Sequence, residues 1–228
     1  MARSPVPRLL IFLAVAMFLE PAAAGAAQRS YLIRSATTTI TFDNAWLATL
    51  RSAGVEVSAG GGARLTITKP KNAAPIVRAH FSLRVPKRAE NGNLLAYRTS
   101  QGTLLQVNHA GSLTLRSLDT PGAITFRQPI AVLSAPQVST GANRFDAVLA
   151  RQQPRGSESM VRVGRVSIPR PRGGRVEIRM NNVVFDCGSG LLNGTDPESP
   201  AGSANWFPSA GRRTMGDIVM VLHVKRTS

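Results

Sequence analysis

Cysteine is almost absent from this chain of 228 residues, which has Cys187 alone. One thiol cannot form a disulfide within the chain, so the fold must rest on its hydrophobic core. Cys187 is best interpreted as a small buried residue, with pairing between chains or a reactive thiol as alternatives. Phe, Trp and Tyr make up only 5% of the residues, which is few for a protein that stacks the bases of single-stranded nucleic acid. We find no specific nucleic-acid motif.

Histidine is scarce as well, with three in the chain, and no two of them have the spacing of metal ligands. A zinc site typically needs three or four ligands. The chain also lacks the G-x-S-x-G and S-x-x-K motifs of serine nucleophiles and the lysine of a phosphate-binding loop. We therefore predict no catalytic residue, no metal site and a protein that is not an enzyme.

Long apolar runs are missing after the first residues of the chain. At the start, Arg3 and Arg8 precede an apolar run of 11 residues, Leu9–Leu19, and "AAAGAA" then offers small residues for cleavage. This layout is typical of a secretory signal peptide, and the run is shorter than the roughly 18 residues of a membrane span. We predict a signal peptide over 1–26, no transmembrane segment after its cleavage, and a secreted or envelope-associated protein, extracellular or periplasmic. An uncleaved membrane anchor is the alternative.

Acidic residues are outnumbered by basic ones, 12 to 28, which gives a formal net charge of +16. A field of that sign favours polyanionic partners such as anionic polymers or lipids of the cell envelope. Alternation in "RVEIRM" places Arg175, Glu177 and Arg179 on one face of a strand. The candidate contacts for a polyanion are Arg162, Arg165, Arg170, Arg172, Arg175 and Arg179. The alternative is that the basic composition serves solubility alone.

Strand patterns dominate the rest of the chain. "IVRAHFSLRV" alternates apolar and polar residues, and turn sequences such as "NGN", "TPG" and "TGAN" separate many similar runs. One helix is predicted in "DNAWLATLRSAG", where Asp43 is a suitable N-cap and Gly54 can end the helix. We predict an all-β fold, an antiparallel β-sandwich of immunoglobulin-like or related type, with one short α-helix near the N-terminus of the mature chain.

No repeat, linker or step in charge divides the chain after the predicted signal peptide. We therefore predict a single β-sandwich domain over 27–228. One segment differs in composition, because 188–213 is rich in Gly, Ser and Pro. It is predicted to be a long loop, which is unusual inside a compact domain.

Three stretches, "TITFDNAWLATLRSAGVEVSA", "GTLLQVNHAGSLTL" and "GAITFRQPIAVLSAPQVST", resemble the HtaA-type domain of exported bacterial proteins. The resemblance covers roughly 37–170. It implies a β-sandwich and, for the best-known members, haem binding during iron uptake. In those members a tyrosine ligates the iron, and a histidine in an H-x-G-x-L-x-L segment supports the tyrosine. His109 matches that histidine, whereas the helix here carries Trp46 and no tyrosine.

His109 therefore has two interpretations. It precedes Gly111 in "NHAG", which favours a tight turn between "TLLQV" and "SLTLRS". Alternatively, it supports a haem ligand, for which Tyr97 and Tyr31 are the candidates. We expect an exported, non-catalytic, HtaA-like protein that has a binding or structural role in the cell envelope or outside the cell. We expect no cofactor. A haem-binding protein of iron uptake and a protein that adheres electrostatically to anionic polymers or lipids are the alternatives.

Overall fold

The computed structural model describes residues 29–84, 92–98, 102–119, 123–135, 143–149, 157–185 and 214–227. The predicted signal peptide, Cys187 and the predicted loop at 188–213 lie outside the described residues. The helix α1 spans Asn44–Ser52. The strands of the described residues are β1 (Arg29–Phe42), β2 (Val55–Gly60), β3 (Arg64–Thr68), β4 (Ile76–Ser82), β5 (Leu94–Arg98), β6 (Gly102–Asn108), β7 (Ser112–Ser117), β8 (Ala123–Ala135), β9 (Arg144–Leu149), β10 (Ser157–Arg162), β11 (Arg175–Phe185) and β12 (Thr214–Thr227).

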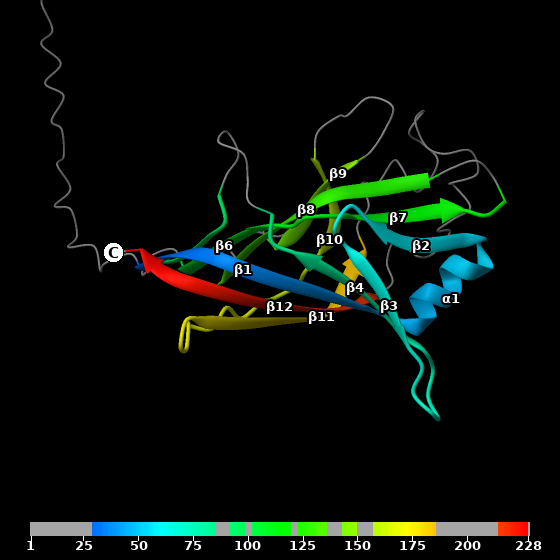
Figure 1. The fold of residues 1–228 in the computed structure, drawn as a ribbon, viewed down its shortest axis with the longest axis horizontal. Helices are drawn as coiled ribbons and strands as arrows, with labels where there is room; N and C mark the ends of the chain where they lie inside the picture. Colours follow the sequence, from blue (N-terminus) through cyan, green and yellow to red (C-terminus); the bar gives the residue numbers. More distant parts are fainter. Residues whose placement is uncertain are drawn as a thin grey trace, which may run out of the picture.

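The strands pair antiparallel in the order β12-β11-β10-β9-β8-β6-β5-β1-β4-β3, while β7 pairs with both β2 and β8. β12 pairs in addition with β1, which joins the two ends of the described chain. In Figure 1, β1, β12 and β11 form one layer and β2, β7 and β8 form the other. The predicted all-β antiparallel sandwich with one short helix is confirmed.

The hydrophobic core lies between the two layers. In β12 the alternate residues Ile218, Met220 and Leu222 are fully buried, while Val219 and Val221 on the other face are partly exposed. Each fully buried aliphatic side chain of this size stabilises the fold by roughly 1.5–3 kcal/mol. The period of two in the sequence therefore decides which face of each strand meets the core.

The helix α1 begins and ends where the sequence predicts. The Asp43 carboxylate accepts hydrogen bonds from the backbone N–H groups of Ala45, at 2.8 Å, and Trp46, at 3.0 Å. Gly54 follows the helix in the left-handed region, with φ 65°. Trp46 is buried and stacks on Phe42 with ring centroids 5.4 Å apart. α1 is the single helix among the described residues, and it is too short to cross a membrane.

The segment "NHAG" does not form a turn between paired strands. β6 pairs with residues 130–135 of β8, and β7 pairs with residues 123–127 of the same strand. β6 and β7 therefore follow one another along one edge of β8, and residues 109–111 join them. On the side away from β8, the strand that pairs with the chain changes at this junction: β5 pairs with β6, and β2 pairs with β7. The tight-turn prediction is wrong because the two flanking runs pair with a third strand and not with each other.

Gly111 is required at this junction for two reasons. Its φ of 101° is a conformation that residues with a side chain rarely adopt. A Cβ atom at this position would also lie 2.3 Å from the backbone nitrogen of Ala63. The junction thus brings the loop between β2 and β3 into direct contact with the chain after His109.

Candidate functional site

His109 lies in the interior and is 1% exposed. Its Nδ1 is 2.9 Å from the carbonyl oxygen of Pro129, and its Nε2 is 2.7 Å from the Thr38 hydroxyl. A carbonyl only accepts, so Nδ1 carries the proton and Thr38 donates to Nε2. Phe81 packs against the ring edge-on, with centroids 6.2 Å apart.

This environment keeps His109 neutral. Burial lowers its pKa to about 4, and the hydrogen bond to the Pro129 carbonyl opposes that shift only in part. The small cavity beside the ring has no room for a water-sized molecule. Both ring nitrogens are engaged by protein groups, so the described contacts explain the histidine without a ligand.

Tyr97 and Tyr31 meet at the opposite end of the sandwich. Their rings contact edge-on, with centroids 5.8 Å apart. The Tyr97 hydroxyl donates to the carbonyl oxygen of Pro169 at 2.5 Å. Burial raises the pKa of Tyr97 to about 12, Tyr31 adds to the rise, and Arg170 opposes it. Tyr97 is thus a neutral phenol, whereas an iron ligand would be a phenolate.

Strand register separates Tyr97 from His109. β5 and β6 are neighbours, but Tyr97 pairs with Thr103, six residues before His109. At about 3.3 Å per residue this distance is roughly 20 Å. Tyr31 lies seven residues before Thr38 on β1, or roughly 23 Å from the partner of His109. The structure does not bring either tyrosine to the histidine.

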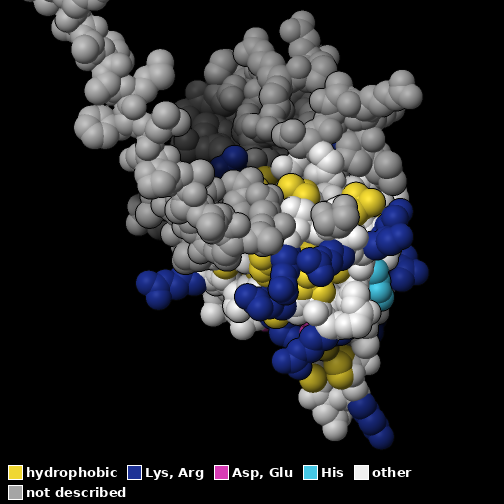
Figure 2. All heavy atoms as spheres, turned by 90° about the vertical axis from the view of Figure 1, so that its left-hand side faces the viewer, with side chains coloured by type: hydrophobic (Ala, Val, Ile, Leu, Met, Phe, Trp, Pro, Cys, Tyr) yellow, Lys and Arg dark blue, Asp and Glu magenta, His cyan; other side chains and the backbone are white. Residues whose placement is uncertain are grey.

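Cations surround the two tyrosines. Arg29 pairs with Tyr97 in the ladder between β1 and β5, and Arg226 pairs with Tyr31 in the ladder between β1 and β12. Arg172 and Arg175 form backbone hydrogen bonds with each other across a turn of two glycines. The carbonyl of Gly174 in this turn accepts a hydrogen bond from the backbone N–H of Val224 in β12. We call this region the basic end, and its exposed cations are Arg29, Arg170, Arg172, Arg175, Lys225 and Arg226. Figure 2 views this end, where Lys and Arg side chains gather and hardly any acidic side chain is visible.

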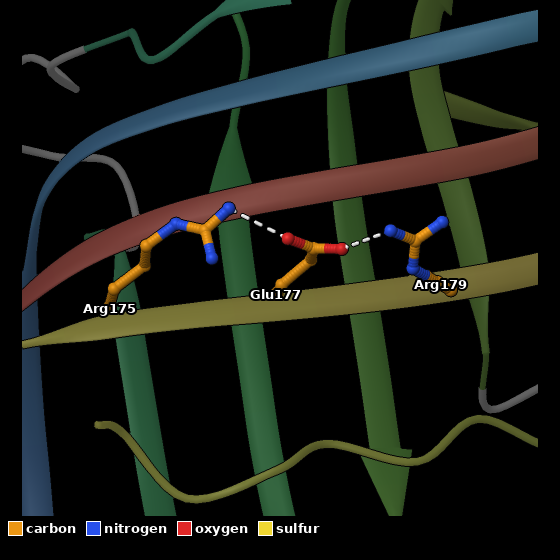
Figure 3. Close-up of polar contacts among 3 residues, drawn as sticks. All are labelled: Arg175, Glu177 and Arg179. Carbon is orange, nitrogen blue, oxygen red and sulfur yellow. Dashed lines mark hydrogen bonds and ion pairs between the residues drawn. The ribbon is translucent and has the colours of Figure 1, made fainter.

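Two of the predicted polyanion contacts are occupied by a carboxylate. Glu177 lies between Arg175 and Arg179 on the outer face of β11, with ion-pair distances of 2.7 and 2.5 Å (Figure 3). Hydrogen bonds from Arg175 and then Arg179 lower the pKa of Glu177. The three residues together carry one net positive charge, so Arg175 and Arg179 offer less to a polyanion than their number suggests.

The six predicted arginines do not form one surface. Arg162 pairs with Val184, nine residues from Arg175 along β11, which is roughly 30 Å away. Arg165 is exposed three residues after Arg162. Only Arg170, Arg172 and Arg175 reach the basic end. Sequence reasoning missed Arg29, Lys225 and Arg226, because they join the site only through the pairing of the first and last strands.

The described residues hold no group of three His, Cys, Asp or Glu side chains placed to bind a metal ion. His80 is held by two threonine hydroxyls. Its Nδ1 is 3.1 Å from the Thr39 hydroxyl, and its Nε2 is 2.9 Å from the Thr66 hydroxyl. His80 therefore bridges β1 and β3 across β4. Like His109, it has both ring nitrogens in hydrogen bonds to protein groups.

No family model matches this chain, and no curated protein matches it either. Among solved structures, the chain is similar to the C-terminal domain of HtaA from Corynebacterium glutamicum. The TM-score is 0.48 and the sequence identity 10%, over 86% of this chain and 99% of that domain. This is a distant structural likeness, and it transfers neither residues nor a ligand from one protein to the other.

Proposed function

We propose that this chain is an exported, non-catalytic module that binds anionic polymers of the cell envelope through its basic end. The observation that carries the proposal is the cluster of exposed cations around Tyr31 and Tyr97, contributed by both ends of the described chain and by the turn before β11. A surface with charge of one sign attracts polyanions and raises their local concentration.

The distribution of acidic residues also supports binding of a polyanion at the basic end. Five carboxylates lie among the described residues whose side chains are placed. Four of them cluster at the end of the sandwich that carries α1: Asp43, Glu56, Asp119 and Asp217. Exposed Arg51 and Arg116 lie at that end as well, so cations and carboxylates are mixed there. At the basic end the exposed cations have no such set of carboxylates beside them among the placed side chains, which favours polyanion binding at the basic end.

The chemistry of the histidines supports a non-catalytic role. A general base must offer a free nitrogen to a substrate. Two of the three histidines do not: His109 is buried with both nitrogens bonded, and His80 is bonded to two threonine hydroxyls, while His223 is exposed on the outer face of β12. Binding, unlike proton transfer, needs only the exposed guanidinium and ammonium groups of the basic end.

Titration with soluble inorganic polyphosphate tests the proposal. We expect binding that weakens at least about tenfold as the salt concentration rises from about 0.05 to 0.5 M, because salt screens exposed charges. Neutral dextran serves as the control polymer and is expected not to bind. Binding of polyphosphate that is insensitive to salt would contradict an electrostatic mechanism.

A pair of charge-matched variants locates the binding surface. The first replaces Arg170, Arg172 and Arg226 of the basic end by Gln. The second replaces the same number of exposed arginines away from that end: Arg64, Arg116 and Arg127. Both lose three charges, so a general effect of net charge weakens them equally. We expect the first to lose about tenfold in affinity and the second less than about threefold.

A further inference from the structure

A groove of about 310 Å³ opens at the end of the sandwich that carries α1. We call it the helix groove. Its volume lies at the lower end of the roughly 300–1,000 Å³ that is usual for small-molecule sites. Eight of the side chains that line it are aliphatic: Leu47, Leu50, Val55, Val57, Leu65, Ile67, Val77 and Leu118. The groove is distinct from the basic end, which lies at the other end of the molecule (Figure 1).

Two aliphatic side chains of the helix groove are unusually exposed. Ile67 is 59% exposed and Leu118 is 67% exposed, and they are the two most exposed large hydrophobic residues in the described part of the chain. Ile67 pairs with the buried Val77, so it belongs to the core-facing side of β3, although more than half of its surface is exposed. The backbone N–H of Leu118 donates to the Gly54 carbonyl at 2.7 Å, which holds Leu118 in place. An ordered, exposed apolar rim is typical of a binding site.

The charges at the groove indicate an anionic head group. Arg51 and Glu56 are the two charged residues among the described residues that line it. Glu56 lies opposite Arg116 in the ladder between β2 and β7, where opposite charges offset one another. Glu177, whose carboxylate holds Arg175 and Arg179, lies on β11, and no carboxylate of the described residues forms an ion pair with Arg51. Its guanidinium at the last turn of α1 is therefore available to an acidic ligand.

We propose that the helix groove binds a single-chain aliphatic carboxylate, with the hydrocarbon chain against the leucine, isoleucine and valine side chains and the carboxylate at Arg51. Among the described residues, the lining offers aliphatic groups and no aromatic ring on which a planar ligand would stack. The described lining also contains none of the His, Cys, Met or Tyr side chains that ligate haem iron. A flexible hydrocarbon chain therefore suits the groove better than a porphyrin does.

Displacement of 11-(dansylamino)undecanoate from the purified protein by dodecanoate provides the test. We expect fluorescence enhancement on binding of the probe and its reversal by dodecanoate. Ile67→Asp places a charge at the exposed rim, where folding tolerates it, and is expected to weaken binding at least about tenfold. Leu32→Asp is the matched control, because Leu32 is also exposed, at 40%, but lies on β1 away from the groove.

The head group is tested with a second variant and a second ligand. Arg51→Gln is expected to weaken dodecanoate about tenfold and to leave dodecanol unchanged. Equal effects on both ligands would overturn the assignment of the carboxylate to Arg51. Absence of probe binding, equal losses in Ile67→Asp and Leu32→Asp, or displacement of the probe by hemin but not by dodecanoate would overturn the proposal. Polyphosphate binding is measured on the same variants, and its retention in Ile67→Asp separates this site from the basic end.

Discussion

The junction at His109 and the basic end at Tyr97 differ in almost every physical property, although the family resemblance joins them in one site. At the junction, a neutral histidine is 1% exposed and has both nitrogens bonded. At the basic end, a half-buried phenol donates to a carbonyl and exposed cations surround it. The first is a buried polar group satisfied by its neighbours, and the second is an accessible surface with excess charge. Only the second has the features of a binding site for a polyanion.

This difference shows how strand register separates residues that a sequence motif suggests are partners. β5 and β6 are neighbours, with Tyr97 on β5 and His109 directly after the end of β6. They are nevertheless roughly 20 Å apart, because they lie at opposite ends of the pairing. A side chain can therefore match a family motif in sequence while its expected partner is out of reach.

The largest effect is expected for Gly111→Ala at the junction. The added Cβ is strained at this backbone conformation and meets the Ala63 backbone, so the free energy of unfolding should fall by about 4 kcal/mol. Gly173→Ala is the control, because Gly173 also has a positive φ, 55°, but has open space around it. It should cost about 1 kcal/mol. Denaturant unfolding of both variants measures the difference, and equal losses would show that contact with Ala63 is unimportant.

His109→Ala is expected to destabilise the protein by about 3 kcal/mol. The change leaves a cavity and removes the partner of both the Pro129 carbonyl and the Thr38 hydroxyl, each of which is then buried and unpaired. His223→Ala, at an exposed position on β12, should change the free energy of unfolding by less than about 0.5 kcal/mol. A loss below about 1 kcal/mol for His109→Ala would contradict a structural role.

The stability of the protein should depend on pH through His109. The pKa of its ring is about 4 in the folded state, against 6.5 for an unperturbed histidine, which represents the unfolded chain. Between these values the unfolded chain binds a proton that the folded chain does not. The contribution of this group therefore lowers the free energy of unfolding as the pH falls from 6.5 to 4, by roughly 3 kcal/mol, and levels off below that.

The comparison with His109→Gln isolates this titration, because other ionisable groups are common to both proteins. The stability difference between the wild type and the variant should shrink between pH 6.5 and 4. Parallel stability curves for the two proteins would contradict the account, because they would indicate that the pKa of His109 is the same in the folded and the unfolded chain.

A smaller effect is expected for Tyr97→Phe at the basic end. The variant loses the hydrogen bond to the Pro169 carbonyl and should lose about 1 kcal/mol of stability. Because Tyr97 is a neutral phenol in this site, the absorbance spectrum of the protein with added hemin should be the same for the variant and the wild type. A change in the Soret band that requires the Tyr97 hydroxyl would restore the tyrosine as an iron ligand.

Local patterns were sufficient to predict the fold class. Alternation placed Val77, Ala79 and Phe81 on the buried face of β4, and Asp43 and Gly54 marked the ends of α1. Both signals are local, since a strand alternates with a period of two and a helix cap depends on residues within one turn. The turn predicted at "NHAG" was wrong because the same residues suit a hairpin turn and a junction between two successive strands that both pair with one neighbouring strand. Which of the two forms depends on β8, whose partners the local sequence does not reveal.

The candidate site could be predicted only in part for a related reason. Arg170, Arg172 and Arg175 are close in sequence, and their charge pattern pointed to them. Arg29 and Arg226 join them because β1 pairs with β12, with Ser30 opposite Thr227. Pairing between residues so far apart in sequence leaves no local signal. The burial of His109 also depends on a distant residue, since its partner Thr38 lies 71 positions away.

The central claim, that anionic polymers bind at the basic end, is tested most directly by locating the arginines that a polymer covers. Modification with phenylglyoxal, followed by mass spectrometry, reports the accessibility of each guanidinium with and without polyphosphate. We expect polyphosphate to protect Arg29, Arg170, Arg172 and Arg226 and to leave Arg51 and Arg116 at the opposite end as reactive as before. Equal protection of both ends, or protection at Arg51 and Arg116 alone, would contradict the assignment.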